Sequence, residues 1–113
     1  MRKPGTDDDH AQMSDFLCDF CGSTWTDDLP MVEGHQGSLI CARCLAVAYR
    51  QVILANDNSA PEGYSCALCL LTKPEHAWLS PATGAVACRW CVNKSADMLE
   101  KDPDMGWAKP RQP

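Results

Sequence analysis

The chain has 113 residues, eight of them cysteine, and a formal net charge of −5. This length accommodates one domain or two very small ones, neither of which buries a large hydrophobic core. No apolar run approaches the length of a membrane span, and no segment is strongly basic, which argues against a nucleic-acid partner.

The first 14 residues contain no apolar stretch and carry an acidic run at positions 7–9. They lack the features of a secretory signal, and their composition predicts a disordered tail. We therefore expect a reducing, cytoplasmic environment, in which paired thiols are metal ligands more often than disulfides.

Two similar units follow this tail, at 15–56 and 64–102, and each contains two Cys-x-x-Cys pairs. The pairs are 19 residues apart in the first unit and 18 in the second. Residues 57–63 are turn formers and predict a linker, and residues 103–113 form a proline-rich C-terminal tail. The pattern predicts an internal duplication, supported by three further correspondences: Phe20 with Leu68, Gly37 with Gly84, and Leu45 with Val92.

Each set of four cysteines has the spacing of a structural zinc site, in which two close pairs supply four thiolates to one tetrahedral ion. A site filled by four thiolates leaves no position for water, so we expect no catalysis. Disulfides, free thiols and a cross-braced arrangement sharing metal between the first and third pairs are the alternatives. Two Zn²⁺ per chain are predicted, with eight ligands: Cys18, Cys21, Cys41, Cys44, Cys66, Cys69, Cys88 and Cys91.

Between its two cysteine pairs, each unit predicts a β-hairpin with glycine near the turn, with strands at 29–33 and 38–41, then at 76–79 and 84–88. A helix should begin at each second pair, because the N–H groups and positive dipole end of a helix N-terminus favour thiolates. Pro103 should limit the second helix. The predicted buried helical positions are Leu45, Ala48, Tyr49 and Val52, then Val92, Ser95, Ala96 and Leu99.

This order of knuckle, hairpin and helix predicts a small, zinc-stabilised α+β fold with two tandem treble-clef zinc fingers. Each unit is too short for a self-sufficient core, whereas a structural zinc contributes apparent binding energy of about 10–16 kcal/mol, much of it folding energy. Taken alone, the duplication predicts that Cys41→Ser or Cys88→Ser removes one zinc and unfolds only its own half.

The segment Leu17-Cys-Asp-Phe-Cys-Gly22, followed by Gly37-Ser-Leu-Ile-Cys-Ala-Arg-Cys44 and an amphipathic helix, resembles the ClpX-type four-cysteine zinc-binding domain. The match covers roughly a third of the chain. The resemblance implies that the four cysteines of the first unit are zinc ligands, and that Phe20 and Gly22 shape the knuckle. Domains of this type are treble clefs that dimerise and serve as docking sites for adaptor proteins and substrates.

The second unit departs from the ClpX-type pattern at Leu70, which stands where the first unit has its knuckle glycine. The chain also contains no Gly-x-x-x-x-Gly-Lys-Ser/Thr phosphate loop, so the resemblance does not imply unfoldase activity. It does imply that the two copies pack as a pseudo-dimer within one chain.

Composition and motifs together favour a non-catalytic module that contacts a protein partner, as an adaptor or regulator. Binding of nucleic acid is the alternative, and a homodimer is left open. We expect most large aromatic rings to pack around the knuckles, with some exposure left for a partner, and Trp107 to dock on the body. His10, His35 and His76 are expected to be exposed, because each set of ligands is already complete. The aromatic residues concerned are Phe16, Phe20, Trp25, Trp78 and Trp90.

Overall fold

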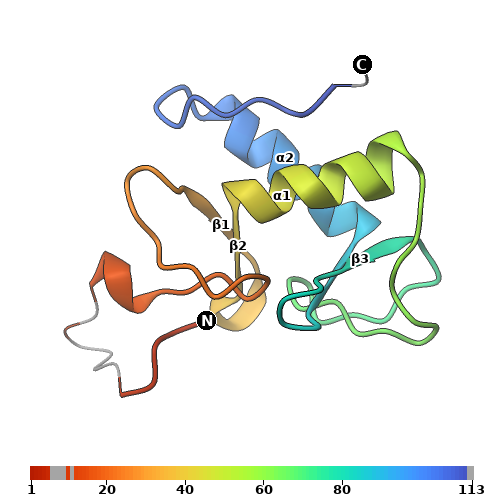
Figure 1. Cartoon of the computed structure of the whole chain (residues 1–113), viewed down its shortest axis with the longest axis horizontal. Coiled ribbons are helices and arrows are strands. Elements are labelled where there is room, and N and C mark those ends of the chain that lie inside the picture. Colours follow the sequence, from red (N-terminus) through yellow and green to blue (C-terminus); the bar gives the residue numbers. More distant parts are fainter. Residues whose placement is uncertain (6–9, 11, 112–113) are drawn as a thin grey trace.

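In both halves of the chain, two cysteines in a tight turn are followed by a two-stranded antiparallel hairpin and a helix (Figure 1). The computed structural model describes residues 1–5, 10 and 12–111. We call the two cysteine turns, at 18–22 and 66–70, the first and second knuckles. The elements are η1 (Met13–Asp15), β1 (Met31–Glu33), η2 (His35–Gly37), β2 (Leu39–Cys41), α1 (Ala42–Tyr49), η3 (Arg50–Leu54), β3 (Ala77–Leu79), β4 (Val86–Cys88) and α2 (Arg89–Lys101).

Both hairpins lie where the sequence predicts them, but their strands are shorter. β1 begins after Pro30, which has no backbone N–H and whose carbonyl accepts from the Ala42 N–H at 2.9 Å. At the other end of this hairpin, next to the turn η2, the Gly34 N–H donates to the Ser38 carbonyl at 2.8 Å. The two hairpins have the same register relative to the metal-binding pairs, because Met31 lies opposite Cys41 and Ala77 lies opposite Cys88.

Each helix begins directly after the third cysteine of its half. In α1 the Cys41 sulfur accepts from the Cys44 N–H at 3.5 Å and so occupies the N-cap position. η3 continues α1 with π-helical turns, and α2 ends at Lys101, close to Pro103. All eight predicted core positions are buried: Leu45, Ala48, Tyr49, Val52, Val92, Ser95, Ala96 and Leu99.

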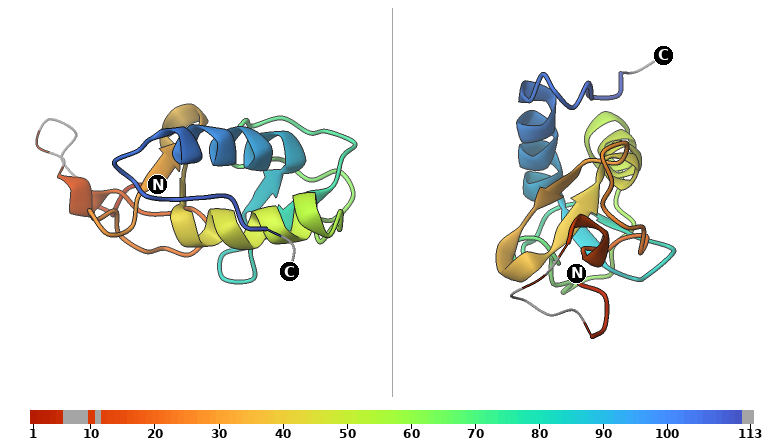
Figure 2. Two further views of the ribbon diagram at one scale, coloured as in Figure 1. Left: turned by 90° about the horizontal axis from the view of Figure 1, so that it is seen from above. Right: turned by 90° about the vertical axis from the view of Figure 1, so that its left-hand side faces the viewer.

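The two helices lie side by side and run in opposite directions, on top of the two hairpins (Figures 1 and 2). Each helix also reaches the other half of the chain: α2 packs on β1, and η3 packs on β3. The buried residues of both halves therefore form one continuous hydrophobic core.

Each hairpin also contacts the knuckle of the opposite half. The His35 N–H donates to the Leu68 carbonyl at 2.7 Å, and the Ser80 hydroxyl donates to the Phe20 carbonyl. Phe20 and Trp78 stack across the same boundary, with ring centroids 5.6 Å apart. Because Phe20 and Leu68 occupy equivalent knuckle positions, these contacts are reciprocal.

Both terminal segments touch the body of the protein. The Met1 amino group donates to the Gly37 carbonyl at 2.8 Å, and Arg2 forms a β-bridge with Phe16. The acidic run at 7–9, predicted to lie in a disordered tail, falls outside the described residues. After α2 the chain turns back toward α1 (Figure 2), and Trp107 packs against the core as predicted.

No helix among the described residues is long and apolar enough to cross a membrane.

Candidate metal centres

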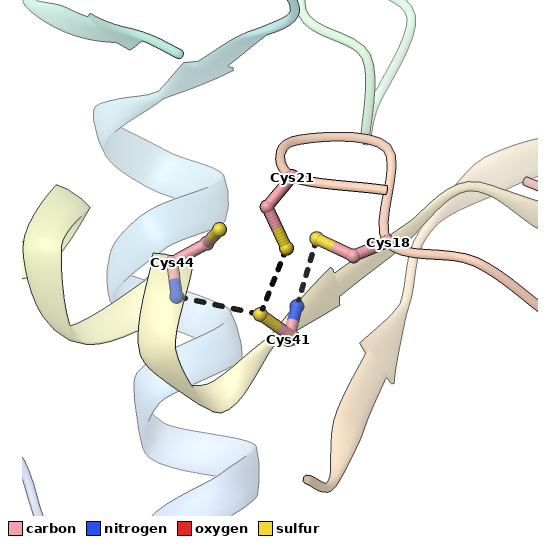
Figure 3. A group of neighbouring side chains, drawn as sticks. All are labelled: Cys18, Cys21, Cys41 and Cys44. Atoms are coloured by element: carbon pink, nitrogen blue, oxygen red, sulfur yellow. Dashed lines mark hydrogen bonds between the residues drawn. The ribbon is translucent and has the colours of Figure 1, made fainter. Parts of the chain in front are cut away.

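The first candidate centre joins the first knuckle to the junction between β2 and α1. Cys18 and Cys21 come from the knuckle, Cys41 ends β2, and Cys44 lies in the first turn of α1 (Figure 3). Their four sulfurs all lie within 4.8 Å of one another, and the Cys21 and Cys41 sulfurs are 3.7 Å apart. The helix start therefore brings the third and fourth thiols to the pair held by the knuckle.

The second candidate centre repeats this arrangement with the second knuckle, β4 and α2. Its four sulfurs also lie within 4.8 Å of one another, and those of Cys69 and Cys88 are 3.8 Å apart. A zinc ion at about 2.3 Å from four sulfurs gives a tetrahedron with edges of about 3.8 Å, whereas a disulfide needs about 2.05 Å. All eight cysteines are free thiols, and each group of four comes from one half, not from a cross-braced pairing.

Backbone N–H groups point at the first sulfur of each group. The Cys18 sulfur accepts from the N–H groups of Phe20 and Cys41, both at 3.3 Å. The Cys66 sulfur accepts from Leu68 and Cys88, both at 3.4 Å. Because such bonds stabilise the charged form of an acceptor, they act to lower the pKa of Cys18 and of Cys66, and the neighbouring thiols decide the net direction at each position.

The thiols of the first centre are too close to lose their protons independently. Hydrogen bonds from the Cys18 and Cys44 thiols lower the pKa of Cys41 to about 2. The bond to Cys41 in turn raises the pKa of Cys18 to about 11, and bonds to Cys18 and Cys41 raise the pKa of Cys44.

The second centre behaves in the same way, with a different thiol favoured as the anion. Bonds from the Cys88 and Cys91 thiols lower the pKa of Cys66, while the bond to Cys66 raises the pKa of Cys88 to about 12. Both centres therefore stabilise a first thiolate and oppose further deprotonation. Four thiolates in so small a volume require a divalent cation, and soft sulfur donors at tetrahedral spacing suit zinc.

A lysine partly offsets the negative charge of the second centre. The Lys73 ammonium lies 3.8 Å from the Cys88 sulfur. Desolvation lowers the pKa of Lys73, but the attraction of Cys88, Cys69 and Cys91 outweighs it and raises the pKa overall. At the first centre, the neighbouring cation Arg43 donates instead to the Ser23 hydroxyl at 2.9 Å.

Both groups of four are enclosed by the fold. Seven of the cysteines are buried and Cys21 is half-buried, and these are the two clusters of metal-binding side chains found among the described residues. His10, His35 and His76 are exposed, as predicted. The two centres can therefore each hold one zinc ion with four sulfur ligands, and two Zn²⁺ per chain is consistent with this geometry. A zinc ion bound in this way would stabilise the fold.

The two knuckles have the same backbone despite different residues. Gly22 has a φ of 76°, and Leu70, at the equivalent position, has a φ of 64°. The backbone hydrogen bonds that close the two turns also match. The Gly22 N–H donates to the Cys18 carbonyl at 2.8 Å, and the Leu70 N–H donates to the Cys66 carbonyl at 2.9 Å. Leu70 adopts a left-handed conformation that L-residues other than glycine rarely take.

The aromatic residues divide into buried and exposed groups. Phe20 and Trp78 are buried in the core, and Phe16 and Trp25 are half-buried and meet edge to face at 6.2 Å. Trp90 lies in the first turn of α2 and is 54% exposed.

Sequence reasoning did not identify the apolar neighbours of Trp90. Leu70, Leu71 and Met98 are 44%, 55% and 59% exposed. We call these three residues, together with Trp90, the apolar patch. The dipeptide Leu70-Leu71 was its sequence signal, because the first knuckle has Gly22-Ser23 at these positions.

No family model, curated protein or solved structure matches this chain. The resemblance of the first half to ClpX-type domains therefore stays a prediction from its sequence.

Proposed function

We propose that the protein is a cytoplasmic, non-catalytic zinc module that binds a partner protein through the apolar patch. In this proposal each half is a treble-clef finger of the ClpX type, and the two fingers form a pseudo-dimer within one chain. The reciprocal contacts between hairpins and knuckles support the pseudo-dimer. The enclosure of both sulfur groups supports a structural role for the metal, because catalytic zinc requires an open coordination position.

The observation that carries the proposal is the composition of the second knuckle. An exposed leucine in a left-handed conformation destabilises the fold by about 1–3 kcal/mol, and glycine would relieve that strain, as it does at Gly22. Leu70 and Leu71 are nevertheless exposed, and they follow Cys69, which lines one hollow together with Trp90 and Met98. Large exposed apolar side chains that do not contribute to the core are typical of protein contact sites.

The test is to compare copurification of partner proteins by the full-length protein and two variants in cells of its source. Trp90→Ala together with Met98→Asp should remove most of the specific partner. The matched control is Val47→Asp, which places the same charge on a 48% exposed apolar position of α1, outside the patch. Equal loss with both variants, or no loss with the first, would contradict the proposal.

Nucleic-acid binding is the second candidate, and one observation favours it. The ammonium groups of Lys73 and Lys94 lie 4.8 and 5.9 Å from the centroid of the Trp90 ring. An exposed ring beside two cations can stack on a base while the cations contact phosphate. Titration with single-stranded and double-stranded probes should show affinity that falls steeply with salt if this candidate is correct, and the net charge of −5 opposes it.

A further inference from the structure

The chain that follows α2 returns across both helices. Gly106 comes directly after the turn at 103–105 and has a φ of 62°, a left-handed conformation that favours glycine. The residues after it cross the helix pair on the side away from the hairpins (Figures 1 and 2). We call residues 106–109 the strap. It belongs to the second half of the chain, but it reaches the start of α1 in the first half.

The first attachment of the strap is the ring of Trp107. Trp107 is half-buried, packs against the shared core and lines a hollow of about 520 Å³ together with Leu29, Ala42 and Ala46. Ala42 and Ala46 are four residues apart in α1, so they lie on the same face of the helix, about one turn apart. A ring seated at this face spans the first turn of α1 and favours its helical conformation.

The second attachment is Lys109, which binds α2 at two points. Its ammonium lies 2.5 Å from an Asp97 carboxylate oxygen, and its backbone N–H donates to the Glu100 carboxylate at 2.7 Å. The hydrogen bond between the side chains lowers the pKa of Asp97 and raises the pKa of Lys109. Because the side chains of Lys109 and Asp97 are 29% and 38% exposed, salt screens their attraction.

The backbone of the strap adds little to these attachments. From Gly106 to Arg111, no backbone-to-backbone hydrogen bond forms with another described residue. Segments that are held by few contacts open at a low cost in free energy while the rest of the protein stays folded. The strap can therefore detach without unfolding of either half.

Trp107 lies against the helical turn that carries half of the first metal centre. Cys41 occupies the N-cap of α1 and Cys44 lies in its first turn, with Ala42 and Arg43 between them. Exchange of a bound ion requires that at least one sulfur leaves it, and the ends of a helix fray more readily than its middle. A contact that holds the first turn of α1 therefore slows the departure of Cys44.

The start of α2 is held in a different way. The Arg89 side chain donates to the Val52 carbonyl at 2.5 Å and to the Asn56 side chain at 3.3 Å. The Trp90 N–H donates to the Glu75 carboxylate at 3.3 Å. Because none of these partners belongs to the strap, the second centre is an internal control for any effect of the strap.

We propose that the strap is a releasable device through which the second half controls metal exchange at the first centre. With the strap attached, the first turn of α1 stays closed and the ion is retained. When the Lys109 ion pair is screened or displaced, Trp107 leaves its hollow and the first centre exchanges its ion faster. This inference goes beyond the proposed function, because it concerns retention of the metal and not contact with a partner.

The first experiment measures backbone motion of the zinc-loaded protein by NMR relaxation of its amides. Residues 106–109 should have order parameters of about 0.85 in the unchanged protein, as in rigid backbone, and below about 0.6 in Lys109→Glu. The control Lys101→Glu makes the same change of charge at the exposed end of α2 and should leave the strap rigid. Low order parameters in the unchanged protein would overturn the inference, because the strap would then not be attached.

The second experiment follows the replacement of zinc by cadmium, whose NMR signals report the two four-sulfur centres separately. Trp107→Ala should accelerate exchange at the first centre about fivefold or more, and exchange at the second centre should stay within about twofold. Lys109→Glu should act in the same direction. Adding Asp97→Lys to Lys109→Glu should restore slow exchange by forming the ion pair in the opposite sense, and Lys101→Glu is again the control.

Salt provides a readout that a purely structural role of the Trp107 ring would not change. Higher salt should accelerate exchange at the first centre of the unchanged protein more than at the second, and this difference should disappear in Lys109→Glu. Equal acceleration of both centres by Trp107→Ala would indicate general destabilisation and overturn the inference. Unchanged exchange at the first centre in both Trp107→Ala and Lys109→Glu would also overturn it. None of these measurements involves the apolar patch, so the proposed function is tested separately.

Discussion

The two halves of this protein hold their sulfurs in the same way but differ at their surfaces. The turn bonds of the two knuckles agree within 0.1 Å, being 2.8 Å at Gly22 and 2.9 Å at Leu70. The backbone is therefore determined by the need to direct two thiols at one point, whatever residue stands at the left-handed position. Outside this frame, Asn58 and Ser59 form hydrogen bonds with the outer edge of β3, whereas the outer edge of β1 has no hydrogen-bond partner among the described residues. The second half also exposes the apolar patch.

These two differences meet in one place. Val32 and Glu33 of β1 line one hollow together with side chains of the second half, which include Leu68, Trp90 and Met98. Two halves with the same metal-binding framework and reciprocal contacts can thus differ at the surface that they form together. Substitutions at matched positions of the two halves should show how far the halves are equivalent and how far the structure of each depends on the other.

The largest effect is expected from loss of one metal centre. Cys41→Ser should remove one zinc per chain. The sequence alone predicts that only the mutated half unfolds, but the contacts between the halves change this expectation. Each hairpin contacts the opposite knuckle, and α1 packs on α2, so both halves should lose their native structure. Loss of a structural zinc removes apparent binding energy of about 10–16 kcal/mol, which exceeds the usual stability of a small domain.

Metal analysis and NMR amide dispersion check this prediction, with Cys88→Ser as the reciprocal variant. Retention of native amide shifts for the whole unmutated half in either variant would show that the fingers fold independently.

The second largest effect is expected at the stacked pair across the boundary. Trp78→Ala should destabilise the zinc-loaded protein by about 3–5 kcal/mol, as is typical when a large buried aromatic residue is truncated. Urea unfolding followed by circular dichroism should still show one transition. Trp25→Ala is the control, because Trp25 is half-buried and meets Phe16 within its own half; an equal loss there would argue against special importance of the boundary.

A smaller effect is expected where the first hairpin approaches the second knuckle. A Cβ atom at Gly34 would lie 2.6 Å from the Leu68 carbonyl oxygen and 2.9 Å from the Leu68 Cα. Gly34→Ala should therefore cost about 1–3 kcal/mol through overpacking. At the equivalent position, Ser80→Ala introduces no clash but removes two hydrogen bonds, one donated to the Phe20 carbonyl and one accepted from the Ala82 N–H, and should cost about 1–2 kcal/mol. Thermal unfolding of both variants measures the difference, and a neutral Gly34→Ala would mean that the halves are less closely apposed.

The smallest effect is expected at the knuckle residue that distinguishes the halves. Leu70→Gly should stabilise the protein by about 1 kcal/mol, because relief of left-handed strain outweighs the greater freedom of glycine in the unfolded chain. Gly22→Leu should destabilise it by a similar amount. If thermal unfolding showed that Leu70→Gly is destabilising, burial of Leu70 against a neighbour, not strain, would dominate at this position.

Much of the metal-binding framework follows from short-range patterns. The cysteine spacing places two thiols in each tight turn and two at each helix start, and the glycines near the turns predict the hairpins. The buried helical faces from Leu45 to Val52 and from Val92 to Leu99 could also be predicted, because apolar residues recur there with helical periodicity. The strand ends were less accurate, since Pro30 and the turn after Glu33 shorten β1 from both ends.

The surface could not be predicted in the same way. Trp78 in β3 and Trp90 in the first turn of α2 belong to the same half, yet Trp78 stacks on Phe20 of the opposite half and Trp90 faces solvent. The sequence also predicted only a linker at residues 57–63, whereas the Ser59 N–H donates to the Ala77 carbonyl of β3. These outcomes depend on residues far apart in the chain.

By itself, the sequence determined the two groups of four sulfurs, the hairpins and the helix starts, because each depends on residues within one unit and on the preference of thiolates for a helix N-terminus. Only the tertiary structure decided how the units join: each hairpin against the opposite knuckle, one shared core, one strand edge covered and its counterpart open. The physical reason is that packing between two similar units depends on side chains far apart in the sequence, and the residue pattern within one unit does not specify which surfaces of the two units meet.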